Sequence, residues 1–226
     1  MTTAILLAAG KSSRMGANVD KAFLSLVDKP VVAWSLLAFE RCTDIDSIVL
    51  VVRKDQLLAS KAVVKMFGIS KAAKIVAGGA KRQESVAAGL EACDLDTRYV
   101  VVHDAARPLV TPEVISEVVK NVKRFPAVTV GYPMADTVKR CDKGSTVSET
   151  IPRDKLWAVQ TPQAFNAQLI KRAYAEVEKR KVEVTDDASA VELLGEPVKI
   201  YETDLPNLKI TTVEDLQLAA AVVLKR

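Results

Sequence analysis

The amino-acid sequence predicts an α/β protein with a mostly parallel, twisted sheet and helices on both of its faces. Short apolar runs rich in valine, isoleucine and alanine alternate with longer segments of helical period along most of the 226 residues. This alternation is typical of strand–helix–strand units, in which crossover helices cover the sheet. The apolar runs are nearly continuous, as expected of strands buried on both faces. We therefore predict a Rossmann-like architecture.

The elements follow one another in a regular order. The predicted strands are 4–8, 48–52, 75–77, 99–102 and 127–132, and the predicted helices between them are 31–40, 57–67, 83–92 and 113–125. Pro30 and Pro112 open two of these helices, while Gly68 and Pro126 end two others. Nearer the C-terminus, we predict a helix over 167–180 capped by Asn166, a short helix after 185–187, strands at 198–202 and 208–211, and a last helix from about Val213.

The alternation of strands and helices breaks between Asp136 and Gln160. Two short alternating runs, 137–140 and 146–151, flank a polar stretch at 141–145 that predicts a hairpin turn. An isolated two-stranded ribbon is marginally stable in water, so we expect the hairpin to pack on another surface, with a second subunit as the natural candidate. A mobile surface hairpin is the alternative. We expect one domain, residues 1–226, with a dimerisation arm at about 136–160.

Composition excludes several classes of protein. The 32 basic and 28 acidic residues give a net charge of +4 and are mostly interleaved, which argues against a nucleic-acid-binding face and fits an anionic small substrate. No apolar run approaches the roughly 20 residues that span a bilayer, and the N-terminus lacks the features of a signal peptide. The three cysteines show no CxxC spacing. We expect a cytoplasmic protein with free thiols and no membrane partner.

The first predicted strand runs into a loop of small and cationic residues. Small side chains at 8–10 allow a ligand to approach the backbone, and amides that follow a strand can form an anion-binding nest. Lys11, Arg14 and Lys21 add positive charge close by. Neither GxxxxGK[ST] nor GxGxxG fits the loop, so it predicts phosphate binding without indicating a kinase or a dinucleotide-binding protein.

Polar and glycine-rich segments follow several other predicted strands. Gly78-Gly79 follows the third, the HDAARP segment at 103–108 follows the fourth, and Asp136-Thr137 follows the fifth. Ligands of open α/β sheets bind beyond the carboxyl ends of the strands. We therefore expect these segments to converge on a single site.

The residue types at this site favour transfer of a phosphoryl or nucleotidyl group. The chain has one histidine, His103, and no GxSxG sequence, so a nucleophilic triad is excluded, and the zinc ligand sets are lacking as well. At the end of a buried strand, His103 is expected to be structural. Nucleotidyl transfer needs mainly positioning and fixed cations, for which Arg14, Lys21 and Lys209 are suitable. The expected metal is Mg²⁺, held mainly by phosphate oxygens.

Together these segments resemble one family of nucleotidyltransferases. The blocks that support the resemblance are Ala8-Ala9-Gly10, Arg14-Met15, Lys21, Gly78-Gly79, Arg82, Ser85, His103 to Pro108, Asp136-Thr137, Thr161-Pro162-Gln163, Thr185-Asp186 and Lys209-Ile210-Thr211. They look like those of the 2-C-methyl-D-erythritol 4-phosphate cytidylyltransferases of the non-mevalonate isoprenoid pathway, from Ala4 to Leu218. The resemblance implies transfer of CMP from CTP to the phosphate of methylerythritol phosphate, with release of pyrophosphate and formation of 4-diphosphocytidyl-2-C-methyl-D-erythritol.

The resemblance also implies a role for individual residues. The implied catalytic residues are Arg14, Lys21 and Lys209. The implied nucleotide-binding residues are Ala8, Ala9, Gly10, Gly79 and Ser85, with Asp104 and Ala105 on the ribose side. The implied substrate-binding residues are Asp104, Arg107, Thr137 and Lys209, joined by Arg153 and Thr161 from the neighbouring subunit of a homodimer formed through the arm.

The sequence departs from the family pattern at two positions, and alternatives stay open. Ser12 stands where many relatives have a second glycine and Ala22 where many have glutamine, and neither change removes a charge.

The sequence of residues 11–16 also resembles that of molybdopterin nucleotidyltransferases. The HDAARP segment and the arm argue against that family. A ribitol-5-phosphate cytidylyltransferase would share the fold, CTP and most site residues. A noncatalytic nucleotide-binding protein is disfavoured by the three cations together.

Overall fold

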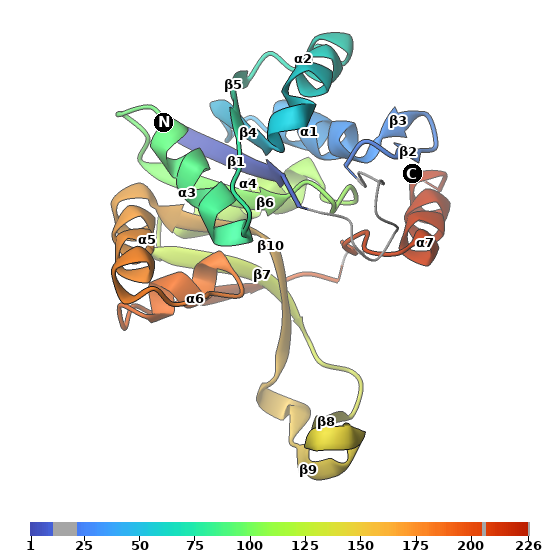
Figure 1. The fold of residues 1–226 in the computed structure, drawn as a ribbon, viewed down its shortest axis with the longest axis vertical. Helices are drawn as coiled ribbons and strands as arrows, with labels where there is room; N and C mark the ends of the chain where they lie inside the picture. The colour runs from blue at the N-terminus through green and yellow to red at the C-terminus, as the bar shows by residue number, and fades with distance from the viewer. Residues whose placement is uncertain (11–21, 205–206, 226) are drawn as a thin grey trace.

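A computed structural model describes residues 1–10, 22–204 and 207–225, which form a seven-stranded sheet with helices on both faces (Figure 1). The sheet order is β11-β7-β10-β6-β1-β4-β5. Its strands are β1 (Thr2–Ala8), β4 (Ser47–Val52), β5 (Ala72–Ala77), β6 (Tyr99–Asp104), β7 (Ala127–Pro133), β10 (Trp157–Asn166) and β11 (Lys199–Glu202). The pairs that involve β10 are antiparallel and the other four are parallel. The predicted α/β class and mostly parallel sheet are confirmed.

Two apolar cores lie on opposite faces of the sheet, because alternate side chains of each strand point to opposite sides. In β1, Ala4 and Leu6 join one core and Ile5 and Leu7 join the other, and all four are buried. The first core is covered by α1 (Val31–Arg41), α2 (Leu57–Met66) and α4 (Pro112–Val122), and the second by α3 (Arg82–Ala92), α5 (Ala167–Arg180) and α6 (Asp187–Glu192). The nearly continuous apolar runs in the sequence reflect this burial on both faces.

The helices begin close to the predicted residues. Pro30 precedes α1, and Oδ1 of Asn166 accepts from the backbone N–H groups of Gln168 and Leu169 at the start of α5, as a capping residue does. The predicted final helix is α7 (Val213–Val223). Helix α4 ends at Val122, three residues before the predicted end. Two short strands, β2 (Ser25–Leu26) and β3 (Lys29–Pro30), pair with each other ahead of α1.

Two strand assignments from the sequence differ from the structure. Strand β10 was not predicted, because Pro162 and several polar residues interrupt its apolar pattern, and its register shifts between Gln160 and Gln163. The predicted strand at 208–211 was wrong, since these residues lie outside the sheet. Instead, the backbone N–H of Ile210 donates to the carbonyl of Ala106, which fastens this segment to the HDAARP loop.

The predicted hairpin is confirmed and extends away from the sheet as an arm (Figure 1). It consists of β8 (Val138–Cys141) and β9 (Val147–Ile151), which pair in antiparallel fashion. Gly144 in the turn has a φ of 77°, a left-handed conformation that glycine adopts without steric cost. Most of the arm is exposed, including Val147, whose exposed fraction is 54%. In the described part of the chain, short 3-10 helices also occur at Lys54–Gln56, Lys143–Ser145 and Arg153–Lys155.

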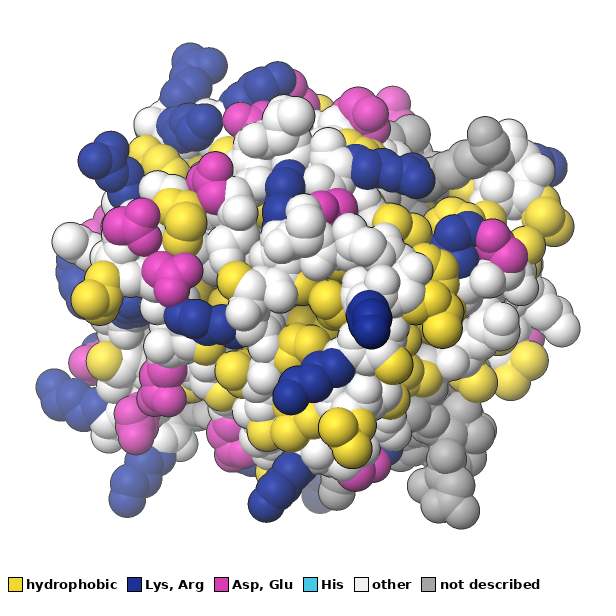
Figure 2. All heavy atoms as spheres, turned by 90° about the horizontal axis from the view of Figure 1, so that it is seen from above, with side chains coloured by type: hydrophobic (Ala, Val, Ile, Leu, Met, Phe, Trp, Pro, Cys, Tyr) yellow, Lys and Arg dark blue, Asp and Glu magenta, His cyan; other side chains and the backbone are white. Residues whose placement is uncertain are grey.

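The surface agrees with the charge pattern of the sequence. On the face shown in Figure 2, Lys and Arg side chains are interspersed with Asp and Glu side chains. Among the described residues, no helix has the length and apolar character required to cross a membrane.

Candidate active site

A cavity of about 150 Å³ lies where β1, β5 and β6 end. It is lined by Leu7, Ala8, Ala9, Gly10, Ala22, Gly79, Ala80, Lys81, Arg82, Ser85, Asp104, Ala106 and Lys209. Segments from four distant parts of the sequence therefore meet at the carboxyl edge of the sheet, as predicted for the loops after β1, β5 and β6. Asp136-Thr137, which was predicted to join them, is not among the residues that line the cavity. The predicted residues Arg14 and Lys21 lie outside the residues that the structure describes.

The loop after β5 is fixed to the first turn of α3. The Ser85 hydroxyl accepts from the backbone N–H of Gly79 at 3.2 Å and lies 3.3 Å from the carbonyl of Lys81. The Glu84 carboxylate accepts from the backbone N–H groups of Ala80 and Lys81. These bonds hold the loop that forms one wall of the cavity. Predicted nucleotide-binding residues Gly79 and Ser85 thus lie on the same wall.

Asp104, at the end of β6, is paired with two cations at the cavity. Its Oδ2 accepts from Nζ of Lys209 at 2.7 Å and its Oδ1 accepts from Nε of Arg82 at 3.3 Å. Burial raises the pKa of the Asp104 carboxyl, but Arg82 and Lys209 outweigh this effect and hold the pKa well below its usual range. Asp104 is therefore an anion that positions two positive charges.

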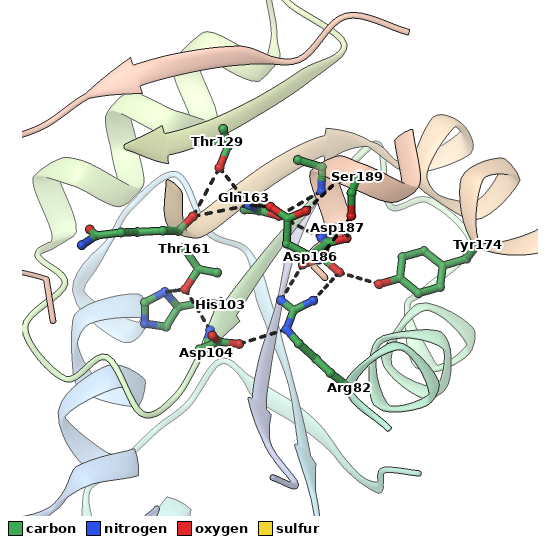
Figure 3. Close-up of polar contacts among 12 residues, drawn as sticks. Arg82, His103, Asp104, Thr129, Thr161, Gln163, Tyr174, Asp186, Asp187 and Ser189 are labelled. Carbon is green, nitrogen blue, oxygen red and sulfur yellow. Dashed lines mark hydrogen bonds and ion pairs between the residues drawn. The ribbon is translucent and has the colours of Figure 1, made fainter. Parts of the chain in front are cut away.

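Arg82 is held more tightly on its other side (Figure 3). Its Nη1 and Nη2 donate to the two carboxylate oxygens of Asp187 at 3.0 and 2.7 Å. The Asp187 side chain is fully buried and also accepts from the Tyr174 hydroxyl at 2.6 Å. Burial lowers the pKa of Arg82, but the carboxylates of Asp187 and Asp104 outweigh it and raise the pKa. Burial and the Asp187 carboxylate both raise the pKa of Tyr174. Arg82 is thus a permanent cation between two carboxylates.

The N-terminus of α6, which positions Asp187, is fixed to β10 by one buried side chain. The Gln163 amide oxygen accepts from the backbone N–H groups of Asp187 and Ala188 at 3.0 and 3.1 Å. Its amide nitrogen donates to Asp186 Oδ2 and Thr129 Oγ1 (Figure 3). Asp186 in turn caps α6 by accepting from the N–H of Ser189. Gln163 and Asp186, from the blocks at 161–163 and 185–186, therefore help to place Asp187.

His103 and Thr161 form a buried chain of hydrogen bonds behind Asp104. His103 Nε2 lies 3.2 Å from the Arg107 carbonyl, which only accepts, so this nitrogen carries the proton. His103 Nδ1 therefore accepts from the Thr161 hydroxyl at 3.1 Å, and Thr161 Oγ1 accepts from the backbone N–H of Asp104 at 3.0 Å. Burial lowers the pKa of His103 to about 3. The predicted structural role of His103 is confirmed.

The segment before Lys209 is tied to the same loop. Arg107 Nη1 donates to the carbonyl of Asn207 at 2.8 Å, and the Asn207 amide donates to the carbonyl of Thr161 at 2.7 Å. Together with the bond between Ile210 and Ala106, these contacts set the place of Lys209. Burial lowers the pKa of Arg107, an effect that Asp104 partly offsets.

Other predicted site residues lie away from the cavity. Ala105 is fully buried in the apolar core, with its N–H bonded to the carbonyl of Leu7, while its neighbour Ala106 lines the cavity. Thr137 and Arg153 are exposed at the base of the arm, where Nη1 of Arg153 donates to the carbonyl of Ala135. Thr161 is buried, and its hydroxyl is hydrogen-bonded to His103 and to the N–H of Asp104 in the same subunit. The roles predicted for these residues remain predictions.

Sequence reasoning assigned no role to several residues that form the site. Ala80, Lys81 and Arg82 directly follow Gly78-Gly79, so their place after a predicted strand was an available signal. Asp187 follows the Thr185-Asp186 block, but nothing in the sequence connects it with Arg82, 105 residues away. Within the described part of the chain, no group of three or more His, Cys, Asp or Glu side chains could hold a metal ion.

Comparisons with known proteins converge on one family. The family model described as 2-C-methyl-D-erythritol 4-phosphate cytidylyltransferase matches residues 2–225. The curated protein of that name from Pelotomaculum thermopropionicum is 45% identical over 224 residues, which cover 99% of this chain and 94% of the relative. The one from Desulforamulus reducens is 42% identical, with 99% and 96% covered.

Solved structures give the same result. The crystal structure of 4-diphosphocytidyl-2C-methyl-D-erythritol synthase from Anaerococcus prevotii matches with a TM-score of 0.86 and 32% identity, covering 100% of this chain and 96% of the other. The 2-C-methyl-D-erythritol 4-phosphate cytidylyltransferase from Thermus thermophilus matches with a TM-score of 0.81 and 31% identity, covering 97% and 98%. The likeness thus extends over the whole fold that forms the cavity.

Proposed function

Because the chain belongs to the 2-C-methyl-D-erythritol 4-phosphate cytidylyltransferase family, we propose which of its residues carry out the family's reaction. The protein transfers CMP from CTP to the phosphate of 2-C-methyl-D-erythritol 4-phosphate and forms 4-diphosphocytidyl-2-C-methyl-D-erythritol. A substrate phosphate oxygen forms the new bond to the α-phosphorus. The bond from that phosphorus to pyrophosphate breaks, and pyrophosphate leaves with the bonding electrons.

The proposal rests chiefly on the ion pair between Asp104 and Lys209 at the wall of the cavity. Lys209 retains an exposed fraction of 36% in its side chain, so its ammonium group can meet phosphate oxygens while Asp104 fixes its position. With Arg14 and Lys21, it would stabilise the negative charge that develops around the α-phosphate. Fixed cations of this kind supply most of what nucleotidyl transfer requires of a protein.

No side chain of the site is assigned as a general base. The attacking phosphate is already ionised near neutral pH, since its second pKa is about 6. His103, the only histidine in the chain, is buried and neutral, and both of its ring nitrogens are engaged within the protein. This environment supports a structural imidazole rather than one that accepts a proton from substrate.

The remaining assignments concern the two substrates. We assign the cytosine site to the backbone around Ala8, Ala9 and Gly79 with Ser85, and we assign Gly10 to nucleotide binding; all of these residues line the cavity. Asp104 would meet the ribose side, and the fully buried Ala105, whose N–H is bonded to the carbonyl of Leu7, would hold this segment in place beside it. Asp104, Arg107, Thr137 and Lys209 would meet the polyol phosphate.

The metal in this proposal is Mg²⁺, bound mainly by phosphate oxygens of CTP. Both oxygens of Asp104, the carboxylate that lines the cavity, already accept hydrogen bonds from cations. Phosphate oxygens and water are ligands that Mg²⁺ ordinarily takes in nucleotide sites. When bound, the ion would neutralise part of the charge of the triphosphate.

The arm would form a homodimer and bring Arg153 to the neighbouring subunit's substrate, whereas Thr161, proposed for the same contact, is buried in β10 and would have to be freed from His103 and Asp104 to reach it. The exposure of β8 and β9 and their extension from the sheet support this proposal, because an isolated ribbon gains little stability by itself (Figure 1). We also propose a cytoplasmic location. The free thiols of Cys42, Cys93 and Cys141 fit a reducing compartment.

A pyrophosphate-release assay tests the assignments. Wild-type protein is expected to prefer CTP among nucleotides and methylerythritol phosphate over ribitol 5-phosphate. Replacing Lys209 with methionine is expected to lower kcat by about 100-fold, the typical cost of losing one fixed transition-state donor. Lys61→Met, an exposed position on α2, serves as the matched control and should retain wild-type turnover. Wild-type turnover by Lys209→Met would contradict the role of Lys209.

A further inference from the structure

A fully buried carboxylate, Asp187, contacts Arg82, which in turn contacts Asp104, the partner of Lys209. Among the described residues of the cavity wall, only Arg82 forms a side-chain contact with it, and it lies at the first position of α6. Burying a charge is costly unless the charge is paired and hydrogen-bonded. Here the Arg82 fork and the Tyr174 hydroxyl supply three donors to the two oxygens. Asp187 is therefore held as a buried, fully paired anion outside the cavity wall.

The two carboxylates that contact Arg82 receive unequal shares of its guanidinium. Asp187 takes Nη1 and Nη2 at 3.0 and 2.7 Å, whereas Asp104 receives only Nε at 3.3 Å. Bidentate pairing is the stronger and more directional form of such contacts. Oδ2 of Asp104 instead accepts from Nζ of Lys209 at 2.7 Å. Asp104 therefore holds Lys209 more closely than it holds Arg82.

Asp187 can keep this division because it is fixed from two directions. Gln163 binds the N–H groups of Asp187 and Ala188, which fastens α6 to β10. Tyr174 reaches Asp187 from α5 with a bond of 2.6 Å. If Asp187 lost its charge, the Arg82 fork would lose its principal partner, and Nη2 could turn to Oδ2 of Asp104 in competition with Lys209.

We propose that Asp187 is a positioning residue for the transfer reaction, because its bidentate hold on Arg82 reserves Oδ2 of Asp104 for Lys209. Tyr174 supports this function by orienting the Asp187 carboxylate. The proposal rests on the catalytic role proposed for Lys209. It predicts that the Asp187 charge affects turnover through Lys209 and not merely through the stability of the fold.

A double-mutant cycle tests this coupling. The kcat for pyrophosphate release, at saturating CTP, methylerythritol phosphate and Mg²⁺, is measured for wild type, Asp187→Asn, Lys209→Gln and the double variant. We expect Asp187→Asn to lower kcat about tenfold or more, as displacement of a catalytic group does. In the Lys209→Gln background the same change should alter kcat by less than about twofold, since Lys209 is no longer there to be displaced.

Two further variants keep the test decisive. Tyr174→Phe removes one donor to Asp187 and retains the ion pair, so its cycle with Lys209 should show the same non-additivity with a smaller loss, even where Asp187→Asn fails to fold. Tyr99→Phe, the same chemical change at the opposite end of β6 from Asp104, should leave kcat unchanged. Thermal unfolding of each variant identifies proteins that are not folded.

The possible outcomes separate the two proposals. Equal losses from Asp187→Asn and Tyr174→Phe in both backgrounds would overturn the positioning role and leave Lys209 as a catalytic residue. Wild-type turnover by Lys209→Gln would overturn the role of Lys209 and, with it, the positioning role that depends on it.

Discussion

Nζ of Lys209 donates a hydrogen bond of 2.7 Å to Oδ2 of Asp104, although the two residues are 105 positions apart in the sequence. Asp104 ends a buried strand, whereas Lys209 lies in a segment outside the sheet. The ion pair thus joins β6 to the segment around Lys209, which supplies the cation. It therefore fixes a positive charge at the cavity before any ligand binds, and such preorganisation is what electrostatic catalysis requires.

Asp104→Asn is expected to lower kcat by about 100-fold, because Lys209 loses the charge that positions it and Arg82 loses the weaker of its two carboxylate partners. Pyrophosphate release at saturating substrates measures the effect. Asp55→Asn removes an exposed carboxylate that pairs only with its neighbour Arg53 among the contacts described, and it should retain full activity. Turnover within twofold of wild type for Asp104→Asn would contradict the positioning of Lys209 by this carboxylate.

The stability of the protein is expected to fall as pH decreases below about 6.5, because of His103. Its pKa is about 3 in the folded protein and about 6.5 in the unfolded chain. Between these values the unfolded state binds a proton that the folded state does not, so the free energy of unfolding decreases by up to about 1.4 kcal/mol for each pH unit. Above pH 6.5 this contribution is constant.

Urea unfolding at pH 7, 6 and 5 measures that slope. His103→Gln should remove most of it, since His103 is the only histidine in the chain and the lowered pKa of Asp104 places that group's titration below this range. A wild-type free energy of unfolding that stays constant from pH 7 to 5 would show that the imidazole is not held neutral.

Gly78→Ala is expected to destabilise the protein by about 1 to 3 kcal/mol, the usual cost of overpacking. A Cβ at Gly78 would lie 2.5 Å from the Ser85 hydroxyl oxygen and 2.7 Å from the Ala9 Cβ. Gly10→Ala is the matched control, because a Cβ at that position meets no atom of the described residues within 4 Å. Urea unfolding compares the two variants. An equal stability for both would indicate that the loop after β5 moves aside without cost.

Mixing inactive Lys21→Met subunits with inactive Arg153→Ala subunits is expected to restore part of the activity. If the arm completes the neighbour's site, each mixed dimer contains one site in which both residues are intact. Lys21→Met mixed with Arg14→Ala should restore nothing, because each site then has one defect. Activity is measured after subunit exchange has been demonstrated. No recovery in the first mixture would contradict the role of Arg153 across the dimer.

Much of the architecture was predictable from local patterns. Buried strands such as β1 and β4 have uninterrupted apolar runs, and Asn166 has the residue type and place of a helix cap. Strand β10 was not predicted, because Pro162 interrupts its apolar pattern. Its pairing with β6 and β7 in antiparallel fashion is visible only in the structure. Residues 208–211 have strand-like composition, yet their backbone follows the HDAARP loop.

The sequence by itself determined the fold class and the place of the site at the carboxyl ends of β1, β5 and β6, with Asp104 at one of these ends. These features depend on periodicity and on residues next to strand ends, both of which are local in the chain. Lys209 does not share this origin, because its segment was predicted as a strand and lies outside the sheet. The tertiary structure alone decided that Asp104 is shared between Lys209 and Arg82, and that Asp187, Tyr174 and Gln163 stand behind Arg82. Such pairings join residues of different elements, and burial makes them selective because an unpaired charge cannot remain in the interior at low cost.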